Sequence, residues 1–167
     1  MKRSIDRGRA VGEYEGALRE IIHALKYERR RSLAAGLAGL MRARGSDVLD
    51  QADFAVPVPL HRRRERQRGF NQARELARHL GLPILDCLKR RRNTDSQMTL
   101  PAGRRHANVR NAFGMRRVTR VDGVRIVLVD DVSTTGATLD ACALVLKDAG
   151  AREVYALTAA RVASRPR

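Results

Sequence analysis

The segment from 126 to 138 combines acidic, hydroxyl and glycine residues in an order that could bind a sugar phosphate. Asp130 and Asp131 follow an apolar run, and hydroxyl residues with Gly136 lead into the next apolar stretch. Unpaired N–H groups at the start of a helix suit a phosphate, and a glycine lets the backbone approach it closely. The two acids would repel a phosphate, but they can accept hydrogen bonds from sugar hydroxyls. The pattern therefore predicts a site for a ribose flanked by a phosphate.

A helix cap that binds no ligand is the plain alternative for Asp131 or Thr134. An acid and a threonine before a helix, taken alone, cap it more often than they form a site. The conjunction of an apolar strand, paired acids, Thr134-Thr135-Gly136 and a helix favours the binding site. The sequence contains neither a GxGxxG motif after a strand nor a GxxxxGK[ST] motif, the two competing phosphate signatures.

A strand and a helix must position these residues. The run 124–129, interrupted only by Arg125, predicts a strand buried on both faces, and 130–135 would be a loop. Residues 136–149 have helical spacing, and 154–158 read as another strand. This strand–loop–helix–strand order predicts an α/β fold with a central, mostly parallel sheet flanked by helices.

The first half of the chain supplies further elements of one domain, 1–167. Apolar residues between 14 and 41 predict one or two amphipathic helices that stop near Gly45. Residues 54–60 read as a strand followed by a basic loop. A helix capped by Asn71 would then run to about residue 80.

Three segments give weaker signals. The polar, basic stretch 1–13 is expected to be frayed. Residues 82–85 could form a second strand. Residues 89–112 lack periodicity, which indicates a flexible lid, a binding loop or disorder.

Composition sets the class of protein. Lys and Arg total 34 against 18 acids, and the net charge of +16 would attract nucleic acid, phosphorylated metabolites or acidic membrane without choosing among them. The excess of Arg could equally reflect GC-rich coding. Cys87 and Cys142 have no CxxC partner, so we expect reduced core thiols. No apolar run could span a bilayer and no signal stretch follows the start, which predicts a soluble, cytoplasmic protein.

The 126–138 segment resembles the 5-phosphoribosyl-1-pyrophosphate (PRPP) signature of type I phosphoribosyltransferases, in which apolar residues precede two acids and a Thr-Thr-Gly-x-Thr loop. The resemblance implies a type I phosphoribosyltransferase-like fold. It assigns the ribose hydroxyls to Asp130 and Asp131, which would be the catalytic residues. It assigns the 5′-phosphate to Ser133, Thr134, Thr135, Gly136, Ala137 and Thr138.

A resemblance to the ComF-like (competence protein F) branch covers most of the chain. It rests on Leu25-Lys26-Tyr27, Val56-Pro57-Val58-Pro59, Arg68-Gly69-Phe70-Asn71-Gln72, and the spacing of Arg90, Thr94, Gln97, Leu100, Arg105, Asn108, Val109, Ala112 and Phe113. Members of this branch are described as phosphoribosyltransferase-like and linked to DNA uptake. Many begin with a four-Cys zinc ribbon, which this sequence lacks, either naturally or by truncation.

The resemblance also implies a pyrophosphate site. In the family, the loop after the first core strand contacts pyrophosphate, which favours Arg62 and Arg68, with His61 beside them. Guanidinium groups grip phosphate oxygens in a bidentate way. Residues 89–112 would be the lid, with Arg90, Gln97, Arg105 and Asn108 as its contacts. The alternatives are a solvated basic loop and an Arg-rich disordered segment.

The resemblance implies transfer of a phosphoribosyl group from PRPP to an unidentified acceptor, usually a ring nitrogen, with release of pyrophosphate. Mg²⁺ would be held mainly by PRPP, with no direct protein ligand. Residues 14–44 would form the helical hood over the acceptor. Two alternatives stay open: a non-catalytic competence factor that binds nucleic acid through its basic surface, and a PRPP-sensing regulator. A homodimer through the early helices is a further hypothesis.

Overall fold

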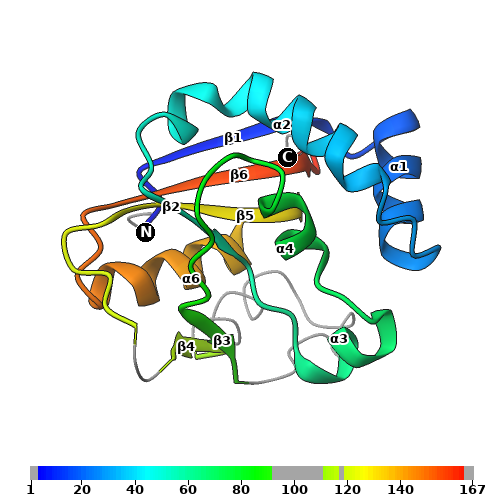
Figure 1. Ribbon diagram of the computed structural model, residues 1–167. Helices are drawn as coiled ribbons and strands as arrows, with labels where there is room; N and C mark the ends of the chain where they lie inside the picture. Colours follow the sequence, from blue (N-terminus) through cyan, green and yellow to red (C-terminus); the bar gives the residue numbers. More distant parts are fainter. Residues whose placement is uncertain (1–3, 92–110, 117–118, 164–167) are drawn as a thin grey trace.

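A parallel four-stranded sheet forms the centre of the computed structural model, which describes residues 4–91, 111–116 and 119–163. The strand order is β1 (Arg7–Glu13), β6 (Glu153–Arg161), β5 (Arg125–Ser133) and β2 (Phe54–Pro57). Figure 1 shows these strands with helices above and below them. The α/β fold with a mostly parallel sheet is confirmed.

Two helical layers bury opposite faces of the sheet. One face packs against α1 (Gly16–Tyr27), α2 (Leu33–Leu49) and α4 (Gln72–Ala77), and the other packs against α6 (Ala137–Asp148). Alternation along β5 divides its side chains between these layers. Val127 and Val129 belong to the first core, whereas Ile126 and Leu128 belong to the second. The continuous apolar run in β5 therefore reflects burial on both faces, as expected.

The polar N-terminal segment is a strand, so the expectation of a frayed stretch is wrong for residues 7–13. β1 pairs in parallel with β6 along its whole length, from Arg7 opposite Tyr155 to Glu13 opposite Arg161. Asp6 extends this pairing, because its N–H donates to the Val154 carbonyl at 2.9 Å. β1 lies at the edge of the sheet, where backbone hydrogen bonds suffice and no apolar alternation is required.

Gly45 kinks a helix rather than ending one. α2 continues to Leu49, and Gly45 has non-helical angles (φ −110°, ψ 15°) inside it. Gly45 is buried, and a Cβ added there would lie 2.6 Å from Leu157 Cδ1. The helix needs a glycine here to approach β6. Because α2 covers the sheet through β1 and β6, the part of the expected 14–44 hood that belongs to α2 is instead a layer of the core.

We expect Gly45→Ala to destabilise the protein by about 1–3 kcal/mol, because the added methyl group overpacks the contact with Leu157. Gly39→Ala in the same helix is the matched control, since an added Cβ there meets nothing within 4 Å. That control should gain about 0.5–1 kcal/mol through helix propensity. Urea denaturation measures both changes, and equal effects of the two substitutions would contradict the packing argument.

Short elements follow β2. The expected basic loop contains the helix α3 (Arg62–Arg68), whose N-cap is His61; His61 Nδ1 accepts from Arg63 N at 3.3 Å. Asn71 caps α4 as predicted, because its Oδ1 accepts from Ala73 N and Arg74 N. Residues 82–85 contribute only one bridge, from Ile84 to Ala55.

A two-stranded antiparallel sheet flanks the predicted lid. β3 (Leu88–Arg90) pairs with β4 (Phe113–Met115), so residues 89–112 begin in a strand; residues 92–110 lie outside the described part of the chain. Both cysteines are free and buried. None of the helices in the ranges described above is long and apolar enough to cross a membrane.

Candidate phosphate and sugar site

Parallel pairing of β2 and β5 brings two distant motifs to one edge of the sheet. Pro57 lies opposite Val129, and Val58 N donates to the Val129 carbonyl at 2.9 Å. Asn71 Nδ2 in turn donates to the Val58 carbonyl at 3.0 Å. The chain leaves both strands at their carboxyl ends, the usual ligand edge of such sheets. The β2–α3 connection and the β5–α6 loop are therefore neighbours.

The loop between β5 and α6 leaves the N-terminus of α6 open. Gly136, the N-cap residue, has a left-handed φ of +78°, and no side chain caps the helix from that position. Ala137 N donates to Thr135 Oγ1 at 3.3 Å, and Thr134 and Thr135 are exposed. The helix dipole, the exposed hydroxyls and the N–H groups of the first turn beyond Ala137 together can receive a phosphate.

Asp130 lies at the end of β5 on the face covered by α6. Burial, then the neighbouring charge of Asp131, raises the pKa of Asp130 well above its usual range. Burial, then the charge of Asp130, likewise raises the pKa of Cys142 in α6, which locates Asp130 near that helix. Asp130 Oδ1 accepts from Asp131 N at 2.9 Å. Asp130 is half-buried, so its carboxyl group can still meet a ligand.

Asp131 lies on the opposite face, in a buried ion pair. Its Oδ2 is 2.7 Å from Lys26 Nζ at the end of α1, and the two side chains are only 5% and 15% exposed. Oδ1 accepts from Val132 N at 2.7 Å. Within the described ranges Asp131 Oδ2 has no hydrogen-bond partner, and the charge of Lys26 is what compensates it. Both acids also belong to β5 rather than to the loop that we expected.

The expectation that both carboxylates open onto one sugar is therefore wrong for this structure. Asp130 faces α6, whereas Asp131 faces α1 and is occupied by Lys26. A role for Asp131 at a ribose hydroxyl stays a prediction, and it requires that Lys26 move or share the carboxylate with the sugar.

Comparison with known proteins bears on this β5–α6 unit. The phosphoribosyl transferase domain family matches residues 66–167, which include the whole unit. The chain belongs to this family.

Relatives assign it to the ComF-like branch. The chain is 39% identical over 155 residues to the DNA utilization protein YhgH of Salmonella typhimurium, covering 87% of this chain and 67% of the relative. It is 33% identical over 162 residues to Competence protein F of Haemophilus influenzae, covering 90% and 71%. A solved structure of the allosteric regulatory enzyme of purine biosynthesis is 25% identical, with a TM-score of 0.45 over 75% of this chain and 26% of the other. That looser likeness adds nothing to the assignment.

The ComF-like motifs lie around two clefts, each of about 340 Å³. Arg62 and Arg90, both predicted pyrophosphate contacts, line one cleft between α3 and β3. Arg68 lines the other, beside Lys26. His61 caps α3. The predicted lid contacts Gln97, Arg105 and Asn108 lie outside the described residues.

A larger cavity of about 780 Å³ lies between α1 and the start of α2. Residues from Gly16 to Leu33 line it, and none of the described lining residues belongs to β5 or its loop. The candidate site therefore lies at the carboxyl edge of β5 rather than in this larger cavity.

Sequence reasoning missed Lys26 as a site residue. The signal was present, because Leu25-Lys26-Tyr27 is one of the ComF-like motifs and a buried carboxylate requires a counter-charge. The sequence did not indicate which carboxylate this lysine meets.

Proposed function

We propose that the protein binds PRPP and transfers its phosphoribosyl group to a nitrogenous acceptor, with release of pyrophosphate. One observation carries the proposal: a short loop joins β5, whose last residues include Asp130 and Asp131, to the N-terminus of α6. Membership of the phosphoribosyl transferase domain family supports it. The two free, buried cysteines suit a reducing compartment, so we propose that the protein acts in the cytoplasm.

In the proposed reaction, residues 133–138 hold the 5′-phosphate and Asp130 accepts a hydrogen bond from a ribose hydroxyl. Departure of pyrophosphate leaves positive charge on the sugar, as in glycoside chemistry. Arg62 and Arg90 would neutralise the departing group from their shared cleft. The chain needs no covalent nucleophile, because positioning and charge stabilisation can lower the barrier.

Mg²⁺ would be held mainly by PRPP oxygens and water, which suits a cation that dehydrates reluctantly. Across the described ranges no group of three or more His, Cys, Asp or Glu residues could form a protein cage for it. Asp130, a half-buried carboxylate, could add a ligand. When bound, Mg²⁺ would supply charge neutralisation to the departing pyrophosphate.

Calorimetric titration with PRPP and Mg²⁺ tests the proposal. We expect one PRPP to bind per chain, and Thr134→Asp to weaken that binding about tenfold or more, because a carboxylate beside the α6 N-terminus repels the phosphate. Negative charge near a helix N-terminus does not destabilise the helix, so the variant should fold. Ser32→Asp at the exposed N-cap of α2 is the matched control and should bind PRPP normally. Failure of the unaltered protein to bind PRPP would refute the proposal.

The names of the relatives favour a second candidate, a role in competence or DNA utilization. The charge of +16 supports contact with nucleic acid through phosphates. DNA affinity that falls steeply with salt, without PRPP turnover, would favour this role. Pyrophosphate release in a screen of acceptors would instead identify the transferase, whereas PRPP binding without release would indicate a regulator.

A further inference from the structure

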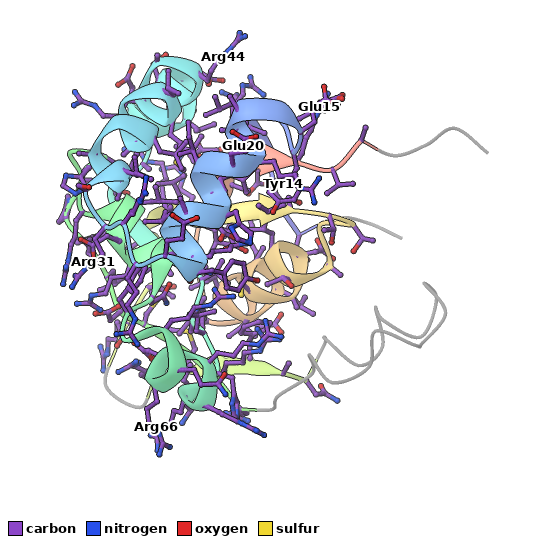
Figure 2. All side chains as sticks on the ribbon, turned by 90° about the vertical axis from the view of Figure 1, so that its right-hand side faces the viewer. Tyr14, Glu15, Glu20, Arg31, Arg44 and Arg66 are labelled. Atoms are coloured by element: carbon purple, nitrogen blue, oxygen red, sulfur yellow. The ribbon has the colours of Figure 1, made fainter. Side chains whose placement is uncertain are left out.

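A cationic cleft adjoins the proposed sugar site on the face occupied by Asp131. It lies between the end of α1 and the helix α3, and Figure 2 shows these two helices one above the other, with Arg66 of α3 pointing away from the protein. The described residues that line the cleft are Lys26, Tyr27, Arg29, Arg64, Gln67 and Arg68. Four of these residues are cationic and none is acidic. At about 340 Å³, the cleft has the size of a small-ligand site.

Neutral groups hold two of these cations in place. Arg68 Nη1 donates to Gln72 Oε1 at 2.9 Å, and the guanidinium group lies 5.2 Å from the centre of the Tyr27 ring. Arg29 Nη2 donates to the Gln67 carbonyl at 3.4 Å. These partners fix the side chains but cancel no charge. The charges of Arg29 and Arg68 can therefore meet an anion, for which arginine is well suited.

The cleft also offers a planar surface. Tyr27 is 61% exposed, and Arg68 covers part of its ring. Nucleic-acid bases stack on aromatic rings and on guanidinium planes, and such stacking does not depend on base sequence. An anion site beside an arginine–tyrosine stack matches a ligand that carries both a phosphate and a base.

This cleft and the Arg62–Arg90 cleft lie on different sides of α3, and they differ in their position relative to the proposed sugar site. α3 divides them, because Arg62 and Glu65 line one and Arg64 and Arg68 line the other. Lys26 connects the Arg68 cleft directly to Asp131. In displacement at a sugar carbon, the attacking and departing groups can occupy opposite sides of the ring. With pyrophosphate in the Arg62–Arg90 cleft, the Arg68 cleft is left for the acceptor.

We propose that the cleft between α1 and α3 binds the acceptor, and that this acceptor is a nucleotide whose phosphate meets Arg29 and Arg68. This inference rests on the proposed function, whose sugar site the cleft adjoins. It moves Arg68 from the pyrophosphate contacts to the acceptor side. A free mononucleotide and the phosphorylated end of a single strand present the same chemistry to the cleft.

Calorimetry with thymidine 5′-monophosphate as the probe tests the inference. We expect saturable binding of one nucleotide per chain, at least tenfold weaker in Arg29→Gln/Arg68→Gln. Thymidine without phosphate, and inorganic phosphate without a base, should each bind at least tenfold more weakly than the nucleotide. Arg42→Gln/Arg44→Gln on α2 makes the same charge change at exposed positions, and Figure 2 shows Arg44 pointing outward. This control should retain the nucleotide.

Several outcomes would overturn the inference. Binding of PRPP without any binding of the nucleotide would remove the acceptor site and leave the proposed function standing. Equal losses of nucleotide affinity in the two double variants would show that only the overall charge of the protein matters. Nucleotide binding without PRPP binding would instead support the cleft and refute the proposed function. A short deoxythymidine oligonucleotide distinguishes the sources: tighter binding of its 5′-phosphorylated form than of the mononucleotide indicates a strand end, and weaker binding indicates the free nucleotide.

Discussion

Asp130→Asn is expected to make the protein more stable at pH 8 and at the same time weaken PRPP binding by roughly ten- to hundredfold. The binding loss follows because asparagine puts an amide NH2 where the second Asp130 oxygen would accept from a sugar hydroxyl, and a polar group left unsatisfied costs about 1–3 kcal/mol. The gain in stability follows from the raised pKa of Asp130, whose ionised form is disfavoured first by burial and then by the charge of Asp131. Asparagine keeps the oxygen that accepts from Asp131 N.

The sign of the pH effect is fixed by linkage. Because the pKa of Asp130 is higher in the folded than in the unfolded chain, the folded protein holds a proton that the unfolded chain releases. Its contribution to stability is lost as pH rises from the ordinary carboxyl pKa, about 4, through the raised value. The melting temperature of Asp130→Asn should therefore exceed that of the unaltered protein by an amount that grows with pH.

Glu20→Gln on the exposed face of α1 is the control for this variant, since it removes one negative charge at an exposed position. Its melting temperature should track that of the unaltered protein between pH 5 and pH 8. A melting temperature of Asp130→Asn that falls below that of Glu20→Gln at pH 8 would contradict the assigned cost of Asp130. Unchanged PRPP affinity would remove Asp130 from the sugar site.

Lys26→Met is expected to destabilise the protein by about 3–5 kcal/mol, because it leaves the buried Asp131 carboxylate without a counter-charge. A loss of this size is a large fraction of the stability of an ordinary domain. Lys147→Met is the matched control: Lys147 also lies 2.7 Å from a carboxylate, that of Asp6, but these side chains are 28% and 40% exposed. An exposed pair should cost about 1 kcal/mol or less. Urea denaturation gives both values.

The double variant Lys26→Met/Asp131→Leu tests whether the loss of stability comes from the unpaired charge of Asp131. With both charges gone, the site is apolar and no desolvated charge remains, so stability should return close to that of the unaltered protein. If Lys26→Met costs no more than Lys147→Met, the ion pair is not the buried contact that its geometry indicates.

The sequence predicted the elements around the candidate site where strong local signals agree. The apolar run of β5, the glycine before α6 and the helical spacing of α6 are all short-range features, and each lies where the pattern indicates. Asn71 likewise caps its helix because capping depends on the next few residues alone. The predicted strand ended at residue 129, before the true end of β5, because we expected two consecutive carboxylates to lie in a loop outside the sheet.

Other features depend on contacts between distant residues. No residue of α3 is buried, so its sequence has no apolar periodicity to reveal a helix. β1 was missed because its partner, β6, lies at the other end of the described chain. The Lys26–Asp131 pair and the approach of Gly45 to Leu157 likewise appear only once the helices lie on the sheet.

The pairing of β1 with β6 has a consequence for how this protein forms. Residues 7–13 leave the ribosome well before residues 153–161, their hydrogen-bonding partners in β6, are made. Contacts between residues so far apart in sequence slow folding, because the intervening chain must be ordered before they form. We expect the nascent chain to wait with an unpaired strand, and the final docking of β1 to be a late event in refolding.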